Sequence, residues 1–145
     1  MRIELRKSEY LHHFLFNLSG GVTMYNDIVM DHFSDPRNVG EMLDADAIGE
    51  VGNPIDGDKI KIFIKVKNDV LIDIKFKTFG CGAAIAASSM VTLLAINKTL
   101  EDALNIQNED VSNALGGLPK EKLLCSNIAA YALHNAIKNY LSSQK

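Results

Sequence analysis

Two adjacent segments alternate apolar and polar residues in the manner of β-strands. In residues 59–67 (KIKIFIKVK), isoleucine or valine occupies every second position. In residues 70–79 (VLIDIKFKTF), apolar residues recur at positions 70, 72, 74 and 76. Side chains of a strand point alternately to its two faces, so each segment predicts a strand buried on one face. Asn68-Asp69 between them is a turn signal, and the sequence therefore predicts an antiparallel hairpin over residues 59–79.

The second half of the chain has helical patterns instead. Residues 83–96 are small and apolar on all sides, which predicts a helix packed on both sides. Thr99 stands as a capping residue before acids that suit a first helical turn. Residues 108–115 predict a further short helix that ends at Gly116-Gly117. From Pro119, at a favoured first helical position, apolar residues at helical spacing predict a long terminal helix.

The segment before the hairpin completes the expected organisation. Residues 25–36 (YNDIVMDHFSDP) have helical spacing and end at Pro36. Residues 38–54 are irregular, with room for a short first strand. A small antiparallel sheet followed by helices is an α+β arrangement, and this is the fold class we expect.

Composition and charge exclude several classes of protein. With 145 residues, 47% of them hydrophobic, the chain is long enough for one domain with a buried core. The net charge of -3, without a basic stripe interleaved with aromatic residues, argues against a nucleic-acid partner. The uncharged residues 78–97 contain serine, threonine and glycine, so we expect a buried helix with its lead-in there and no membrane span. A cytoplasmic protein is the expectation.

The first residues differ from the rest. Residues 1–23 contain a short apolar stretch that histidine and asparagine interrupt, which makes a poor signal peptide. Gly20-Gly21 separate this part from Met24. We therefore expect an N-terminal appendage over residues 1–23 and one domain over residues 24–145.

Cysteines and paired acids supply the candidate chemistry. The chain has only two cysteines, Cys81 and Cys125, which excludes a disulfide-rich scaffold. A single disulfide, two reactive thiols and two metal ligands are the alternatives that remain open. Cys81 stands at a predicted helix start, where a thiolate is favoured, between two glycines that leave its sulfur uncrowded. Its other interpretation is a small buried side chain. Cys125, taken alone, reads as a core residue in the opening turns of the last helix. Asp56 and Asp58 flank Gly57 in GNPIDGD, which indicates either a solvated turn or part of a cation site. The spacing does not fit a calcium loop.

Five stretches, in order, resemble the IscU/NifU-type family of iron–sulfur cluster scaffolds. They are HFSDPRNVG, GNPIDGD, FKTFGCGAAIAASSM, LGGLPKEKLLCSNIAAYAL and AIKNY, within residues 25–140. The resemblance implies a three-stranded antiparallel sheet with helices packed on it, and metal ligands that converge from separate loops at one end.

Matched to the family pattern, Cys81 and Cys125 correspond to its second and third cysteines, and Asp58 to its loop aspartate. Asp56 stands where the family has its first cysteine, and Leu124 where a histidine is frequent. The implied ligand set is therefore Asp56, Asp58, Cys81 and Cys125. Iron–sulfur clusters favour thiolates, whereas a carboxylate is a harder ligand that suits Fe(II) or Zn(II).

The resemblance implies a scaffold, a carrier and not an enzyme. Such a protein accepts sulfur from a cysteine desulfurase on Cys81 or Cys125, binds iron and passes a [2Fe–2S] cluster to acceptor proteins. Two other hypotheses remain open: a zinc-bound sulfurtransferase of the SufU type, and a degenerate domain that only binds the desulfurase. The family's chaperone-binding motif LPPVK stands here as LPKEK over residues 118–122, which argues against that chaperone as a partner.

Overall fold

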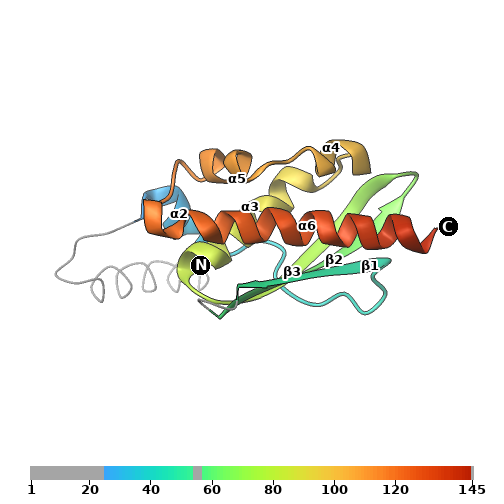
Figure 1. Cartoon of the computed structure of the whole chain (residues 1–145), viewed down its shortest axis with the longest axis horizontal. Helices are drawn as coiled ribbons and strands as arrows, with labels where there is room; N and C mark the ends of the chain where they lie inside the picture. The colour runs from blue at the N-terminus through green and yellow to red at the C-terminus, as the bar shows by residue number, and fades with distance from the viewer. Residues whose placement is uncertain (1–24, 54–56, 145) are drawn as a thin grey trace, which may run out of the picture.

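A computed structural model describes residues 25–53 and 57–144 of the chain, apart from the side chains of Asn53 and Cys125. Figure 1 shows a sheet below a layer of helices. The elements, in chain order, are α2 (Asp27–Ser34), β1 (Ala47–Asn53), β2 (Asp58–Lys67), β3 (Val70–Phe79), α3 (Gly82–Ala95), α4 (Leu100–Leu104), α5 (Asn108–Ala114), a 3₁₀ turn η1 (Lys120–Lys122) and α6 (Leu123–Ser143).

The sheet is three-stranded and antiparallel, with the order β1-β2-β3. Its β2–β3 hairpin confirms the predicted strand bounds to within one residue, and β1 is the short first strand expected between residues 38 and 54. The predicted buried face of β3 was wrong at its start, because an irregularity in register at Lys65/Val66 buries Leu71 and leaves Ile72 46% exposed. Asn68 and Asp69 both have positive φ, 54° and 61°, as a tight two-residue hairpin turn requires. The isoleucines of β2 at positions 60, 62 and 64 are fully buried, so one face of the sheet forms the floor of the core.

Helices α3 and α6 pack on that buried face, α2 lies against α3, and α4 and α5 cover α6 (Figure 1). Most of residues 83–96 are buried, as predicted, because of this position between sheet and outer helices, but Leu93 is 43% exposed. At Gly49 of β1, an added Cβ atom would overlap the backbone of Ala132 and Ala136 in α6. The strand therefore lies directly against the helix, which only glycine permits at this point.

Other parts of the chain bond to both edges of the sheet. On the β1 edge, Asn139 Nδ2 donates to the Ile48 carbonyl at 2.7 Å, and the Glu50 amide donates to Asn135 Oδ1 at 3.2 Å. On the β3 edge, residues 38–40 and 97–100 bond to the strand backbone. These contacts occupy strand groups that would otherwise be open to pairing with another chain.

The helix ends agree with the sequence in one case and differ in another. Thr99 caps α4, since its side chain accepts from the Asp102 amide at 3.1 Å. The prediction of a helix starting from Pro119 was wrong in detail, because Pro119 is extended (φ −56°, ψ 148°) and precedes a 3₁₀ turn closed by the Lys122 amide on its carbonyl. The α-helix itself begins at Leu123. No helix within the described ranges is both long and apolar enough to cross a lipid bilayer.

Candidate functional site

One end of the fold brings together loops that are distant in the sequence. The antiparallel register puts the end of β1, the start of β2 and the end of β3 side by side. Figure 1 places the starts of α3 and α6 at this same end, on the left of the view. Every residue of the predicted ligand set belongs to one of these strand and helix ends or to the connection between β1 and β2.

Asp58 is the first residue of β2, and its side chain is only 6% exposed. It points to the same face as Ile60, because strand side chains alternate. A carboxylate is rarely buried this far unless nearby groups compensate its lost hydration. The Asp58 carboxylate lies beside the thiol of Cys81, with Oδ2 and Sγ 3.9 Å apart. The structure therefore brings two of the four predicted ligands into contact.

Cys81 occupies the cap position in front of α3. Its backbone is extended (φ −75°, ψ 171°), and its carbonyl accepts from the amides of Ala84 and Ile85. The thiol side chain is half-buried at the first turn of the helix, as the sequence predicted. This position places the sulfur near the positive end of the helix dipole, an environment that favours a thiolate.

Gly80 keeps the space in which the Asp58 carboxylate lies. A Cβ atom at position 80 would stand 2.5 Å from Oδ1 and 2.8 Å from Cγ of Asp58. The sequence suggested that the glycines beside Cys81 leave the sulfur uncrowded. The structure gives a different reason for each glycine. Gly80 makes room for the carboxylate, and Gly82 lies against the ring of Phe33, since a Cβ atom at position 82 would stand 3.1 Å from Cδ1 of that ring.

Buried hydrogen bonds fix the middle of α3 against its neighbours. Ser88 of α3 shares a bond with Thr78 of β3 at 2.8 Å and donates to the Ala84 carbonyl. Ser89 shares a bond of 2.7 Å with His32 Nδ1 and accepts from the Arg37 amide at 2.9 Å. Both serines are fully buried. These bonds hold α2, β3 and α3 in register around the loop that carries Cys81.

Sequence reasoning did not identify these supporting residues. The structure places His32 on the buried face of α2, against α3. The signal available was the stretch HFSDPRNVG, where a histidine and an arginine accompany a helix end. His134 of α6 uses Nε2 for a 2.8 Å bond with the Ile106 carbonyl, and burial lowers the pKa of its imidazole.

The other two predicted ligands are not both placed. Asp56 lies outside the described residues, as does the appendage predicted over residues 1–23. Cys125 is the third residue of α6, in the opening turn where the sequence put it, but its side chain is also outside the described part. Leu124 beside it is exposed. Among the side chains that are described, His, Cys, Asp and Glu form no group of three that could hold a metal ion.

Comparisons with known proteins agree with this architecture. The family model described as the NifU-like N-terminal domain matches residues 24–145. A relative from Archaeoglobus fulgidus, named iron-sulfur cluster assembly scaffold protein IscU 1, is 59% identical over 117 residues, which cover 81% of this chain and 76% of that protein. A relative from Aquifex aeolicus, named iron-sulfur cluster assembly scaffold protein IscU, is 50% identical over 122 residues, covering 83% and 78%.

The fold is also found among solved structures. A NifU-like N-terminal protein from Brucella abortus superposes with a TM-score of 0.66 and 16% identity, covering 82% of this chain and 95% of that one. At this identity the likeness shows the fold alone. The expected three-stranded α+β architecture is therefore confirmed both by the strand pairing and by this neighbour.

Proposed function

The chain belongs to the NifU-like N-terminal domain family, and we propose from this that it is a scaffold for iron–sulfur cluster assembly. The observation that carries the proposal is the contact between Asp58 and Cys81, a carboxylate and a thiol 3.9 Å apart at the strand and helix ends. Relatives at 59% and 50% identity are named as scaffold proteins of this process. In this role the protein is a carrier, and the cluster is its cargo.

The proposed ligands are Asp56, Asp58, Cys81 and Cys125. Four anionic groups repel one another when empty, and a divalent ion or a cluster relieves that repulsion. Thiolates match the iron of a sulfide cluster, whereas a carboxylate binds through harder oxygen. We infer that Asp56, in the family's usual cysteine position, makes the bound [2Fe–2S] cluster more labile, which suits a protein that passes it to acceptor proteins.

Sulfur reaches the site from a cysteine desulfurase in this proposal. The thiolate of Cys81 or Cys125 attacks the outer sulfur of the desulfurase persulfide. A new S–S bond forms on the scaffold as the old one breaks, and the desulfurase cysteine leaves as a thiolate. Reduction of that sulfur to sulfide takes electrons from an external donor. Reduced thiols are required throughout, so the proposed location is the cytoplasm.

A zinc-bound sulfurtransferase is the second candidate, because a carboxylate oxygen next to a thiol is also a suitable pair of zinc ligands. The distinguishing experiment is anaerobic purification, followed by determination of iron, zinc and acid-labile sulfide. The scaffold proposal predicts a brown protein with iron and sulfide, and the same after reconstitution. Colourless protein with zinc, unable to take up iron and sulfide, would favour the sulfurtransferase. Protein that binds neither metal would leave only desulfurase binding.

A further inference from the structure

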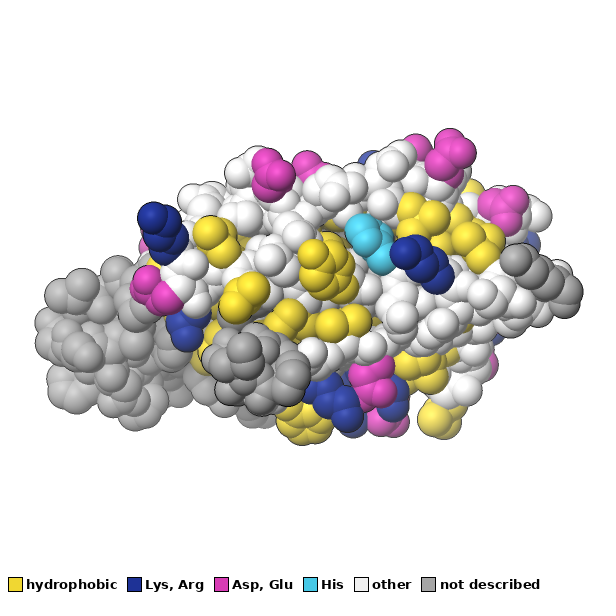
Figure 2. All heavy atoms as spheres, in the orientation of Figure 1, with side chains coloured by type: hydrophobic (Ala, Val, Ile, Leu, Met, Phe, Trp, Pro, Cys, Tyr) yellow, Lys and Arg dark blue, Asp and Glu magenta, His cyan; other side chains and the backbone are white. Residues whose placement is uncertain are grey.

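The outer face of the sheet, turned away from the helices, carries a set of lysines. The strand register arranges its side chains in three rows that run across β1, β2 and β3. From the site end inward, the rows are Gly52–Lys59–Phe79, Glu50–Lys61–Lys77 and Ile48–Phe63–Lys75. Figure 2 shows basic and acidic side chains gathered along the lower edge of the molecule, on the side where Figure 1 shows the sheet.

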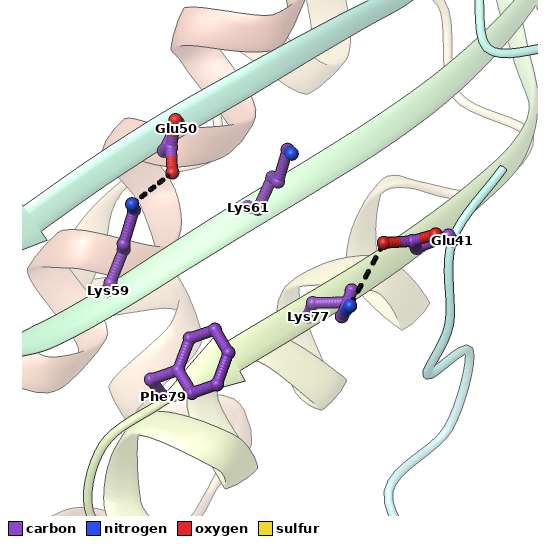
Figure 3. Close-up of a pocket in the computed structure, with 6 residues that line it drawn as sticks. All are labelled: Glu41, Glu50, Lys59, Lys61, Lys77 and Phe79. Carbon is purple, nitrogen blue, oxygen red and sulfur yellow. Dashed lines mark hydrogen bonds and ion pairs between the residues drawn. The ribbon is translucent and has the colours of Figure 1, made fainter. Parts of the chain in front are cut away.

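Lys61 stands between two ion pairs without joining either. Lys59 Nζ lies 2.8 Å from Glu50, and Lys77 Nζ lies 2.9 Å from Glu41. Figure 3 shows Lys61 between these pairs. Within the described ranges, Lys61 forms no ion pair, and its ammonium lies 5.5 Å from the ring centre of Phe63.

The charge of Lys61 nevertheless acts on both acids. The hydrogen bond from Lys77 lowers the pKa of Glu41, and the hydrogen bond from Lys59 lowers the pKa of Glu50. In both cases the positive charge of Lys61 lowers the pKa further. Lys61 also stands directly opposite Lys77 across the strands, an arrangement of like charges that costs stability unless an anion lies nearby.

The side chains around Lys61 enclose a hollow next to the candidate site. Its volume is about 140 Å³, and it is lined by Glu41, Glu50, Lys59, Lys61, Lys77 and Phe79. Phe79 is 67% exposed at the rim of this hollow. It directly precedes the Gly80-Cys81 loop, and Lys59 directly follows Asp58. Whatever occupies the hollow therefore lies beside the strand ends that carry the ligands.

We propose that this lysine face, defined as Lys59, Lys61, Lys75, Lys77 and Phe79, docks an acidic segment of a partner protein. One carboxylate enters the hollow against Lys61, and an apolar side chain covers Phe79. Charge complementarity identifies the occupant: four lysines (59, 61, 75 and 77) against two glutamates (41 and 50) leave the face with a net charge of +2, whereas the whole chain carries -3. None of these side chains is a proposed metal ligand, so the inference is separate from the ligand set.

Amide chemical shifts of the isotope-labelled full chain test this proposal. The probe is a short synthetic peptide with glutamates flanking one leucine and one phenylalanine, and the matched control peptide has lysines in place of the glutamates. The acidic peptide should shift the amides of Lys59, Lys61, Lys77 and Phe79 in a saturable way that added salt weakens. The basic peptide should leave them unchanged.

Two variants separate the charge from the aromatic contact. Lys61→Gln and Phe79→Ser should each weaken acidic-peptide binding roughly fivefold, about 1 kcal/mol. Lys138→Gln makes the same change of charge at an exposed position of α6, and this variant should bind the acidic peptide like wild type. Equal weakening by Lys61→Gln and Lys138→Gln would overturn the proposal, as would shifts centred on other elements. The same saturable shifts with citrate alone would assign a small-anion site instead, and shifts that appear on concentrating the chain without peptide would assign a second copy.

Discussion

Replacement of Gly80 by alanine tests whether this glycine exists to make room for the Asp58 carboxylate. The added Cβ atom would stand 2.5 Å from Oδ1, where ordinary contacts begin at 3.4 Å. The carboxylate must therefore retreat by roughly 0.9 Å, the difference between those two distances. Overpacking of this kind in a close-packed interior costs about 1–3 kcal/mol. We expect Gly80→Ala to lower the free energy of unfolding by at least that amount, because the φ of 158° at this position also strains an alanine backbone.

The origin of the cost can be isolated by a double-mutant cycle. In an Asp58→Ala background the carboxylate is gone, and the nearest remaining contact of the new methyl group is the Ala84 side chain at 3.3 Å. The cost of Gly80→Ala should then fall by about 0.5–3 kcal/mol, a coupling typical of residues in contact, and the remainder is the backbone strain of alanine at φ 158°. Gly52→Ala is the control for an added methyl group without overlap or positive φ, because its Cβ meets only the Asp58 carbonyl oxygen at 3.5 Å, an ordinary contact.

Urea unfolding measures the stability, and cobalt titration measures the site through thiolate-to-metal absorption. Gly80→Ala should bind cobalt about tenfold more weakly, or 1.4 kcal/mol, because the added methyl group displaces a proposed ligand. Gly52→Ala should bind cobalt like wild type. The reasoning would be refuted by a Gly80→Ala cost that is equal in the two backgrounds, because the carboxylate would then have no part in it.

Further predictions concern the support of the fold. Ser89→Ala should cost about 1–3 kcal/mol in urea unfolding, because it removes a buried hydroxyl that bonds both His32 Nδ1 and the Arg37 amide; a neutral result would contradict this. Asn139→Ala should cost about 1 kcal/mol and increase aggregation, since it opens the β1 edge; unchanged light scattering would argue otherwise. Burial lowers the pKa of His134 below 6.5, so the unfolded chain binds the proton more readily. Stability should therefore fall as the pH drops from about 7 to 5, and less steeply in His134→Gln; parallel curves would exclude this histidine. A chain that begins at Met24 should melt within a few degrees of the full chain, and loss of cooperative melting would show that residues 1–23 support the core.

The sheet was predictable because its signals are local. A period of two and an Asn-Asp turn lie within one continuous stretch, residues 59–79, and they fix both strands and the buried face of β2. At the start of β3 the periodicity misled, because a register shift buries Leu71 and exposes Ile72. The helix boundaries were less certain where local bonding competes. After Pro119, a 3₁₀ turn precedes α6, and nothing in the apolar periodicity distinguishes the two kinds of helix.

The site was predictable only in part, because its contacts are long-range. Asp58 and Cys81 are separated by 23 positions, and their proximity was expected from a family pattern and not from periodicity. The role of Gly80 depends on a side chain from another strand, so only coordinates reveal it. The contacts on the β1 edge were unpredictable for the same reason. Asn139 donates to a carbonyl 91 positions away, and an exposed asparagine on a helix gives no sign of this in the sequence.

The lifetime of a reconstituted cluster tests the central claim, that Asp56, Asp58, Cys81 and Cys125 hold a labile iron–sulfur cluster. Wild type, Asp56→Cys, Asp56→Ala and Cys81→Ala are reconstituted anaerobically, and cluster absorbance is followed over time with iron and sulfide counted in each. We expect a cluster in wild type, slower decay in Asp56→Cys because thiolate matches iron better than carboxylate, and loss of the cluster in Cys81→Ala. Asp56→Ala should retain about tenfold less cluster than wild type. Equal decay in all four proteins would contradict the assignment of this site.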